Sequence, residues 1–583
     1  MKQFFKFLLA SILGVILGLF IISLVLIGIA SAGEKKLKVA DNSVLNIDLN
    51  QVSLERNNKD PFSGLNPLAM SFEESPGLYE VTQAIKLAKD HDKIKGINLN
   101  IGLFPMGYAS ATEVRKALED FKSTGKFVYV YSEIYSQKAY YLASVADRVF
   151  LNPMGNLEFK GLGTQITFFT KALENIGVEM QIIRHGKFKS AVEPFMLTEM
   201  SEANRLQTQQ FLSGIWNTVV DDISTSRKIS EESLQSFADR MSAFHADSAL
   251  SLGFVDGLIY QDQYNDSLKA ALGIDDKKVK KIDVLDFLST KPGKGYSQDK
   301  IAIVFAQGEI ISGNAPEGTI GSDRIAAAVR KARENENVKA VVLRINSPGG
   351  SALASDVIWR EIKACSKVKP VIASLGDVAA SGGYYIACAA DTILAHPSTI
   401  TGSIGVFGMI PNLQNLSEEK IGLRFDEVKT AEMANFGSLN RPLSEGERDL
   451  LQNMVENTYS TFLSRVSDGR GIPTNEVDSI GQGRVWSGVD GKNIGLVDGY
   501  GSLSGAIKLA AEKSGLSEYR LVEYPELKDP IQALVEDLTG SNASSIMEEI
   551  PVHDAYLKAY KDLKKIGQHT GVQTWLPYTI YID

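Results

Sequence analysis

The sequence predicts an α/β fold in which one module of alternating strands and helices occurs twice. Short apolar runs typical of strands alternate with longer helical patterns, which indicates parallel βαβ units. The series that begins near residue 77 begins again near residue 300. A chain of 583 residues is also too long for a single hydrophobic core. We therefore expect at least two domains built from the same module.

The elements of the two modules follow each other in the same order. After an alternating strand at 43–49 and a polar surface stretch at 51–76, the pattern predicts helices at 78–89, 110–122 and 137–146 and strands at 94–101, 127–131 and 148–151. The second series predicts strands at 301–305, 338–345 and 371–375 and helices at 323–333, 351–365 and 381–390. Long amphipathic helices are expected at 201–227 and 444–465, in matching places.

Residue matches between the two series indicate an internal duplication. Residues 95–99 fall on 339–343 and residues 140–143 (YYLA) fall on 384–387 (YYIA), both at an offset of 244. Farther on, 253–257 (GFVDG) match 495–499 (GLVDG) at 242. We expect a first domain at 43–291, a second domain at 300–515 and a C-terminal extension at 516–583, whose end, 575–582, is a candidate edge strand or surface cap.

Residues 7–30 form an uncharged apolar run of 24 residues with lysines on both sides. At 1.5 Å per residue such a helix spans a hydrocarbon core of about 30 Å. We expect residues 1–38 to be an N-terminal transmembrane anchor, although Ala30-Ser31-Ala32 also resembles a signal-peptide cleavage site. The flanking lysines leave the orientation open.

The composition of the chain argues against several classes of function. The net charge of −9 argues against a nucleic-acid-binding surface. The only two cysteines, Cys365 and Cys388, lie in apolar helical contexts and are expected to be buried thiols. The sequence contains no metal or nucleotide signature, so no cofactor is expected.

Residues 376–385 (GDVAASGGYY) connect a predicted buried strand to a predicted helix. Ser381 at the start of that helix is a candidate nucleophile, because the free N–H groups of a helix N-terminus can stabilise an oxyanion. The alternative is a simple helix cap. The turn at Gly349-Gly350 also precedes a helix, and its amides could complete an oxyanion hole with Gly382.

A serine nucleophile needs a base, and none of the six histidines has a convincing acidic partner in the sequence. Lys189 lies among Phe188, Ala191, Val192 and Phe195, an apolar setting that would lower its pKa; the alternative is a solvated surface lysine. In the first module Gln137 stands at the position of Ser381, and the second module has no lysine at the position of Lys189, near 434. One module thus keeps the serine and the other the lysine.

Four motifs in this order carry a resemblance to a known family: 184–195 (RHGKFKSAVEPF), 345–351 (INSPGGS), 376–387 (GDVAASGGYYIA) and 397–408 (PSTITGSIGVFG). They closely resemble the long, duplicated form of signal peptide peptidase A (protease IV). The resemblance implies a tandem Clp protease/crotonase-like fold and a membrane-anchored Ser/Lys peptidase that degrades cleaved signal peptides.

Carried over by motif, the resemblance implies Ser381 as nucleophile, Lys189 as general base and Ser403 as a serine that holds the lysine. It also implies a homotetramer in which Ser and Lys meet where neighbouring modules adjoin. The run containing Gly402, Gly405, Val406 and Phe407 is expected to line the groove for extended apolar peptides. We expect a serine endopeptidase of the bacterial inner membrane with its body on the periplasmic side. A crotonase-type acyl-CoA enzyme and an inactive membrane scaffold are the alternatives.

Overall fold

The computed structural model describes residues 37–57, 65–66, 71–72, 75–274, 278–290, 297–527 and 571–575, together with residues 6, 14, 17 and 18. The expected membrane anchor at 7–30 lies outside the described residues apart from the last three of these. Within the described part, no helix has both the length and the apolar composition needed to cross a membrane.

The first module is built on a six-stranded sheet in which every neighbouring pair is parallel. Its strands, in spatial order, are β8 (Gly257–Leu258), β6 (Arg148–Leu157), β5 (Phe127–Tyr135), β4 (Ile94–Asn100), β1 (Ser43–Asp48) and β9 (Lys280–Asp283). Its helices are α2 (Leu78–Asp90), α3 (Tyr108–Lys122), α4 (Gln137–Ala143), α5 (Thr170–Ile176), α6 (Glu202–Arg227), α7 (Glu231–Asp239), α8 (Ala246–Ser251), α9 (Gln261–Leu272) and α10 (Val284–Ser289). The central strands are largely buried on both faces, as expected for a covered parallel sheet.

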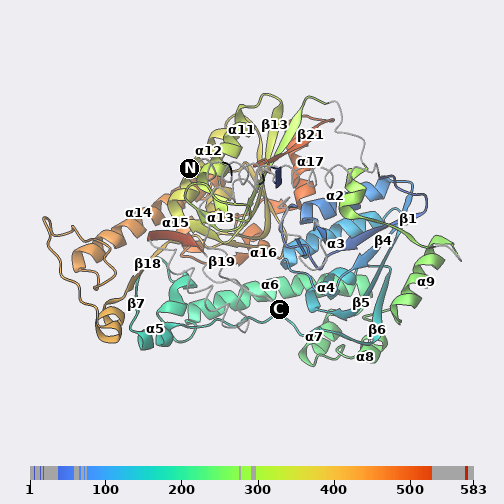
Figure 1. Cartoon of the computed structure of the whole chain (residues 1–583), viewed down its shortest axis with the longest axis horizontal. Coiled ribbons are helices and arrows are strands. Elements are labelled where there is room, and N and C mark those ends of the chain that lie inside the picture. Colours follow the sequence, from blue (N-terminus) through green and yellow to red (C-terminus); the bar gives the residue numbers. More distant parts are fainter. Residues whose placement is uncertain are drawn as a thin grey trace.

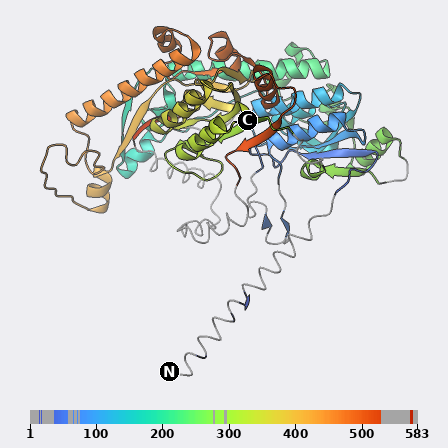
Figure 2. The same cartoon turned by 90° about the horizontal axis from the view of Figure 1, so that it is seen from above.

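The second module repeats this plan around a mostly parallel sheet, and the two modules lie side by side along the long axis of the molecule (Figures 1 and 2). Its strands are β19 (Val485–Ser487), β17 (Ile400–Gly402), β15 (Val371–Ala380), β13 (Val338–Ser347), β10 (Lys300–Gln307) and β21 (Arg520–Tyr524), with β16 (Thr392–Ala395) and β20 (Gly499–Tyr500) branching from β15. Its helices are α11 (Ser322–Glu334), α12 (Ala352–Ser366), α13 (Gly382–Ala387), α14 (Glu445–Arg470), α15 (Thr474–Ile480), α16 (Gly488–Asn493) and α17 (Leu503–Lys513).

Equivalent hydrogen bonds in the two modules confirm the predicted duplication. The hydroxyl of Tyr140 donates to the carbonyl of Phe254 at 2.9 Å, and the hydroxyl of Tyr384 donates to the carbonyl of Leu496 at 2.8 Å. The ion pairs Arg227–Asp256 and Arg470–Asp498 also correspond, and each arginine is the last residue of a helix of 26 residues. The second of these helices extends five residues beyond the predicted end at 465. Both cysteines are buried free thiols, as predicted.

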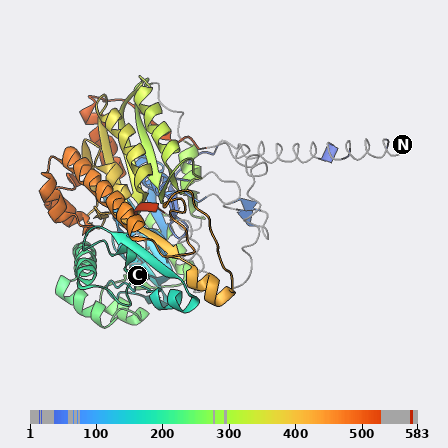
Figure 3. The same ribbon diagram turned by 90° about the vertical axis from the view of Figure 1, so that its left-hand side faces the viewer.

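A third sheet joins the two modules. Its order is β12 (Ile320–Gly321), β11 (Ile310–Ile311), β14 (Gly349–Ser351), β22 (Gly571–Trp575), β18 (Phe407–Asn412) and β7 (Glu179–Arg184). β7 comes from the first module and pairs antiparallel along all six residues of β18 from the second. The two segments have the teal and orange colours in Figure 3. The chain that follows β7 is therefore carried onto the second module.

The structure describes a strand that precedes most of the segment 575–582, which was expected to be an edge strand or a surface cap. It begins at Gly571, and it has neighbours on both sides, β14 and β18, rather than lying at an edge. Of the expected segment only Trp575 lies within the described residues.

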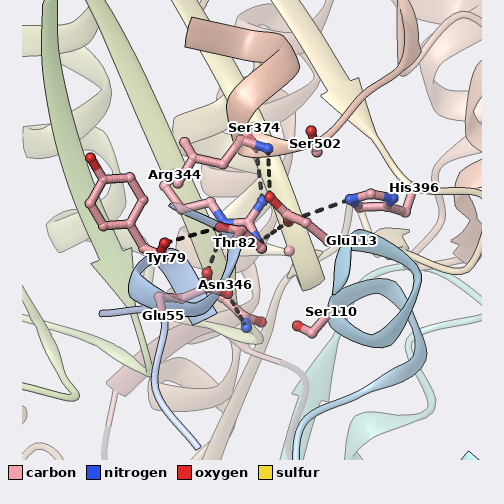
Figure 4. A network of polar contacts seen from close by, with 12 residues as sticks. Glu55, Tyr79, Thr82, Ser110, Glu113, Arg344, Asn346, Ser374, His396 and Ser502 are labelled. Atoms are coloured by element: carbon pink, nitrogen blue, oxygen red, sulfur yellow. Dashed lines mark hydrogen bonds and ion pairs between the residues drawn. The ribbon is translucent and has the colours of Figure 1, made fainter. Parts of the chain in front are cut away.

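A buried polar network fixes the second module against the first (Figure 4). The Arg344 guanidinium on β13 donates to Glu55 and to Glu113 of the first module, each at 2.8 Å, and all three side chains are nearly inaccessible to solvent. Burial disfavours the charge of both carboxylates and raises the pKa of Glu55. At Glu113 burial is outweighed by the charge of Arg344 together with the neighbouring His396 and a hydrogen bond from the Leu503 N–H, which lower the pKa to about 2. His396 Nε2 lies 3.5 Å from Glu113 and so belongs to this network. Such a network makes the relative position of the two modules specific, since breaking it would leave charges buried without partners.

Asp377 adds a second contact of this kind. It lies on β15, and its carboxylate accepts hydrogen bonds from Gly107 N, Ser110 N and Ser110 Oγ at 2.6–2.9 Å. A side chain of the second module thereby caps the first turn of α3 in the first module.

Candidate active site

Ser381 lies between the end of β15 and the start of α13 and is fully buried. Its backbone has φ 55° and ψ −117°, a conformation that a residue with a side chain rarely adopts. The N–H of Ser381 donates to the carbonyl of Gly402 at 2.8 Å, which holds this turn. Its side chain makes no capping hydrogen bond to α13. The helix-cap alternative is therefore wrong, and the strained turn presents the hydroxyl elsewhere.

Lys189 meets that hydroxyl from the other module. It follows β7 and precedes the 3₁₀ helix η1 (Ser190–Phe195). Lys189 Nζ lies 2.9 Å from Ser381 Oγ, 3.1 Å from Ser403 Oγ and 3.4 Å from the Ser403 carbonyl. The surface-lysine alternative is wrong, because only 1% of Lys189 is exposed.

Burial lowers the pKa of Lys189 to about 7. The apolar residues next to it in the sequence, Phe188, Ala191, Val192 and Phe195, are all buried, as predicted. Among the described residues Lys189 forms no ion pair with a carboxylate that would restore the charged form. Near neutral pH a large fraction of this amine is thus uncharged and able to accept a proton.

Two glycines let the lysine lie this close to the second module. A Cβ on Gly483 would lie 2.6 Å from the backbone and Cβ of Lys189, and one on Gly405 would lie 3.2 Å from its Cδ. Gly483 also has φ +80°, a value that favours glycine.

The loop that carries Lys189 is clamped by residues that the sequence did not reveal. Gln207 on α6 donates to the Phe188 carbonyl at 3.1 Å and to Ser190 Oγ at 2.8 Å, and it accepts from Val485 N at 3.1 Å. One side chain thus connects the Lys189 loop with the second module. The buried Glu193 accepts three hydrogen bonds from Ser201 and Asn204 at the start of α6. A polar residue inside a long helix carries no signal of such a role.

The expected oxyanion glycines lie on two segments next to Ser381. Gly382 opens α13, whose first N–H groups have no acceptor within the helix. Gly349 and Gly350 have φ of 101° and 155°, and a Cβ on Gly350 would come within 2.0 Å of the Ile310 carbonyl. The two segments are in contact, since a Cβ on Gly383 would lie 2.7 Å from the carbonyl of Ser347.

The remaining predicted residues are distributed around the pair. Ser403, at φ 51°, donates its N–H to Arg484 O at 2.7 Å and directs its hydroxyl to Lys189. Val406 accepts at its carbonyl from His185 N, and Gly402 and Gly405 pack against Ser381 and Lys189 as described above. Phe407 begins β18, and its ring centre lies 6.0 Å from Lys189 Nζ. Of the four expected groove residues, Phe407 is the one on a strand of the third sheet.

Comparisons with known proteins agree with this division. Residues 120–275 and 363–517 each match the model of peptidase family S49, one stretch in each module. Protease 4 of Haemophilus influenzae is 36% identical over 516 residues, which cover 85% of this chain and 83% of that protein. Protease 4 of Salmonella typhi is 34% identical over 557 residues, covering 92% and 89%. A chloroplastic serine protease SPPA of Arabidopsis thaliana is 33% identical over 488 residues, covering 82% and 72%.

A solved structure that matches is a ClpP1 mutant from Listeria monocytogenes, at 16% identity. The match covers 35% of this chain and 94% of the ClpP1 chain, with a TM-score of 0.24.

Proposed function

The chain belongs to peptidase family S49 and is a serine protease, and we propose that Ser381 is its nucleophile and Lys189 its general base. The observation that carries this proposal is the 2.9 Å contact between Lys189 Nζ and Ser381 Oγ in a buried site. Membership of a peptidase family leaves the acyl-CoA enzyme and the inactive scaffold without support.

The contacts of Lys189 suit a neutral amine. Such an amine has one lone pair and two N–H donors. The lone pair accepts the Ser381 O–H proton, while the two donors are directed at Ser403 Oγ and the Ser403 carbonyl. As Ser381 Oγ attacks the scissile carbonyl, the proton passes to Lys189 Nζ. The ammonium then gives that proton to the leaving amine as the peptide bond breaks, and water hydrolyses the acyl-enzyme by the reverse proton path.

The N–H of Gly382 and an N–H of the Gly349-Gly350 turn would receive the oxyanion. In the present structure Gly349 N donates to Ser347 Oγ at 3.2 Å, a long hydrogen bond that a substrate oxygen would replace. Glycine at 349 and 350 gives the backbone the positive φ that this approach needs.

Extended apolar peptides, cleaved signal peptides among them, are the proposed substrates. Ser381 and Lys189 are both buried, so a folded protein could not bring a peptide bond to them. A peptide in extended conformation can instead join the third sheet as an added strand, with backbone hydrogen bonds giving affinity. The apolar ring of Phe407 beside Lys189 favours apolar side chains at the point of cleavage.

We also propose that residues 7–30 anchor the protein in the bacterial inner membrane, with the catalytic body on the periplasmic side. The support for the anchor is the sequence alone, 24 uncharged apolar residues at the front of the chain.

Association of several copies, a homotetramer by family resemblance, is supported by the duplication. β7 and β18 pair within the chain. The helices α6 and α14 correspond at an offset of 243 residues. At that offset the counterpart of β7 in the second module is 422–427, and the counterpart of β18 in the first module is 164–169. Neither counterpart belongs to a strand in the described structure. Leu423 and Phe425 are 52% and 53% exposed. If 422–427 of one copy pairs with 164–169 of the next, as β7 pairs with β18, head-to-tail association follows.

Phe425→Asp tests that contact. It should reduce the oligomer to smaller species in sedimentation velocity, because a charge would be buried at each junction. An unchanged sedimentation coefficient would contradict the proposed contact and leave the Ser/Lys proposal intact.

The catalytic proposal is tested by acylation. A serine-directed acylating inhibitor followed by digestion and mass mapping should place one label on Ser381. The label should be lost in Ser381→Ala and strongly reduced in Lys189→Ala. Lys187→Ala, an exposed lysine two residues away on the same loop, should label like the wild type. Labelling of a different serine would overturn the assignment.

A further inference from the structure

The space beside the Ser/Lys pair is already occupied by a segment of the same chain. β22 runs antiparallel to β14 on one side, with Gly349 opposite Trp575 and Ser351 opposite Gln573. It runs antiparallel to β18 on the other side, with Phe407 opposite Gln573 and Met409 opposite Gly571. β22 is the dark red strand beside β18 in Figure 1.

A substrate strand would need this same position. The other edge of β14 is taken by β11, and the other edge of β18 is taken by β7. Neighbouring strands lie about 4.8 Å apart, so the gap between β14 and β18 holds a single strand. A peptide that pairs with either strand next to Ser381 must therefore displace β22.

The register matches that of a substrate. Trp575 is opposite Gly349, one of the amides proposed to receive the oxyanion, and the residues before it extend along β14 and β18. Trp575 is thus the residue of β22 that lies in register with the proposed oxyanion hole.

The chain can place this segment there in cis. Residues 528–570, 43 in number, connect the end of the second module to β22. At about 3.3 Å per residue such a connection spans far more than the width of a module. A ligand tethered in this way has an effective concentration on the order of millimolar, well above that of a dilute peptide.

We propose that Gly571–Trp575 is an intramolecular competitor that occupies the substrate groove of this protease in the substrate direction. The proposal rests on the groove assigned under the proposed function. Peptide substrates enter only when the strand leaves, so the strand raises the apparent KM and leaves kcat unchanged. Hydrolysis of the bond after Trp575 would leave the strand tethered, so the competition does not depend on that bond.

A proline in the strand tests the competition in the full-length chain. Gln573→Pro removes an N–H and disfavours pairing with both neighbours. The apparent KM for an extended apolar peptide should fall at least about tenfold with kcat unchanged, given the millimolar effective concentration of the tether. Gln573→Ala removes the same side chain but keeps the N–H and should match the wild type. An unchanged KM in Gln573→Pro would overturn the proposal.

A binding measurement separates this proposal from the catalytic one. In the Ser381→Ala background, a fluorescent peptide with the sequence of residues 568–577 should bind the Gln573→Pro chain at least about tenfold more tightly than the chain with Gln573. A scrambled peptide is the control. Equal affinity for the two chains overturns the competition even if Ser381 is the nucleophile. The two proposals can also fail separately in the other direction. If the expected difference in affinity is found but the inhibitor does not label Ser381 of the wild type, the competition is supported and the catalytic assignment is refuted.

Discussion

The two modules differ most at the turn where the second carries Ser381. In the first module the equivalent helix, α4, begins at Gln137 after a Ser136 cap with ordinary extended backbone, and the Ser136 hydroxyl accepts from Ala139 N. In the second module Ser381 has φ 55°, and its side chain makes no capping hydrogen bond. The turn of the first module is thus a standard helix start, while the turn of the second is strained, as expected if the strain serves the proposed nucleophile.

The side chains of the first module also fill the equivalent of the oxyanion site. The Gln137 amide donates to the Gly161 carbonyl and accepts from the N–H groups of Lys160 and Gly161 at 2.8–3.0 Å. Lys138, at the position of Gly382, donates to the Met106 carbonyl at 2.8 Å. The first module thus uses side chains to satisfy its own backbone at this position.

The modules differ in the opposite sense at the segment that carries the proposed base, Lys189. In the first module β7 and η1 pack on the second module and bring Lys189 to the site. In the second module the equivalent segment, 422–427, is exposed along its length. Each module keeps one half of the proposed pair, so the comparison predicts that neither half works alone.

The largest expected effect comes from removing either half. Ser381→Ala and Lys189→Ala should each lower kcat/KM for a peptide by about 10⁴-fold or more, because the two residues act as one unit. The double variant should be no worse than the single ones. Lys187→Ala should stay within about twofold of the wild type, as expected of an exposed residue outside the site. Activity near the wild-type level in either single variant would show that one of the two residues is not needed for cleavage.

A smaller loss should follow from moving the arm without removing the lysine. Gly483→Ala would place a Cβ 2.6 Å from Lys189 and should lower kcat by about 10²-fold, since a displacement of about 1 Å at a catalytic group costs that much. Gly515→Ala has a similar positive φ but open space around it. It should cost only about 1 kcal/mol of stability and no activity. Equal kinetic effects in the two variants would show that contact with Lys189 is irrelevant.

The pH dependence of kcat/KM tests whether Lys189 acts as the base. Because the lysine accepts a proton only when neutral, kcat/KM should rise with pH through a midpoint of about 7. The unfolded lysine has an ordinary pKa of 10.5, so between about pH 7 and 10.5 the unfolded chain binds the additional proton. The contribution of Lys189 to the free energy of unfolding therefore increases as the pH rises from about 7 to 10.5.

Lys189→Met tests the sign of this linkage. The variant should be more stable than the wild type to urea at pH 7, because it buries no proton-binding amine. The difference should shrink toward zero as the pH approaches 10.5. A margin that stays constant between pH 7 and 10 would mean that the folded lysine keeps its ordinary pKa.

The smallest expected effect is a null result. Gln137→Ser in the Ser381→Ala background returns a serine to the first module but should restore no cleavage. The turn there is relaxed, and the equivalent arm at 422–427 supplies no lysine. Measurable peptide cleavage by this double variant would mean that the first module retains a working site.

The fold and the two central residues could be predicted because both leave a repeated pattern in the sequence. The offset of the matches identified the modules, and the same offset exposed the replacement of Ser381 by Gln137. Element ends were less certain: β5 continues to Tyr135 beyond the predicted 131, and α13 ends at Ala387 before the predicted 390.

The contacts between modules could not be predicted, because the docking of one module on another leaves no repeating pattern in the sequence. The pairing of β7 with β18, the Asp377 cap on α3 and the clamp at Gln207 all depend on it. The same holds for β22, whose neighbours lie more than 150 residues away in the sequence.

The central claim is that a serine of one module and a lysine of the other form a single proton-transfer unit. It is tested most directly by the rate of Ser381 acylation as a function of pH, followed by mass spectrometry in the wild type and in Lys189→Ala. We predict a rate that rises through a midpoint near 7 in the wild type, and in the variant a slow rate without that midpoint. The same rate and the same midpoint in both proteins would contradict it.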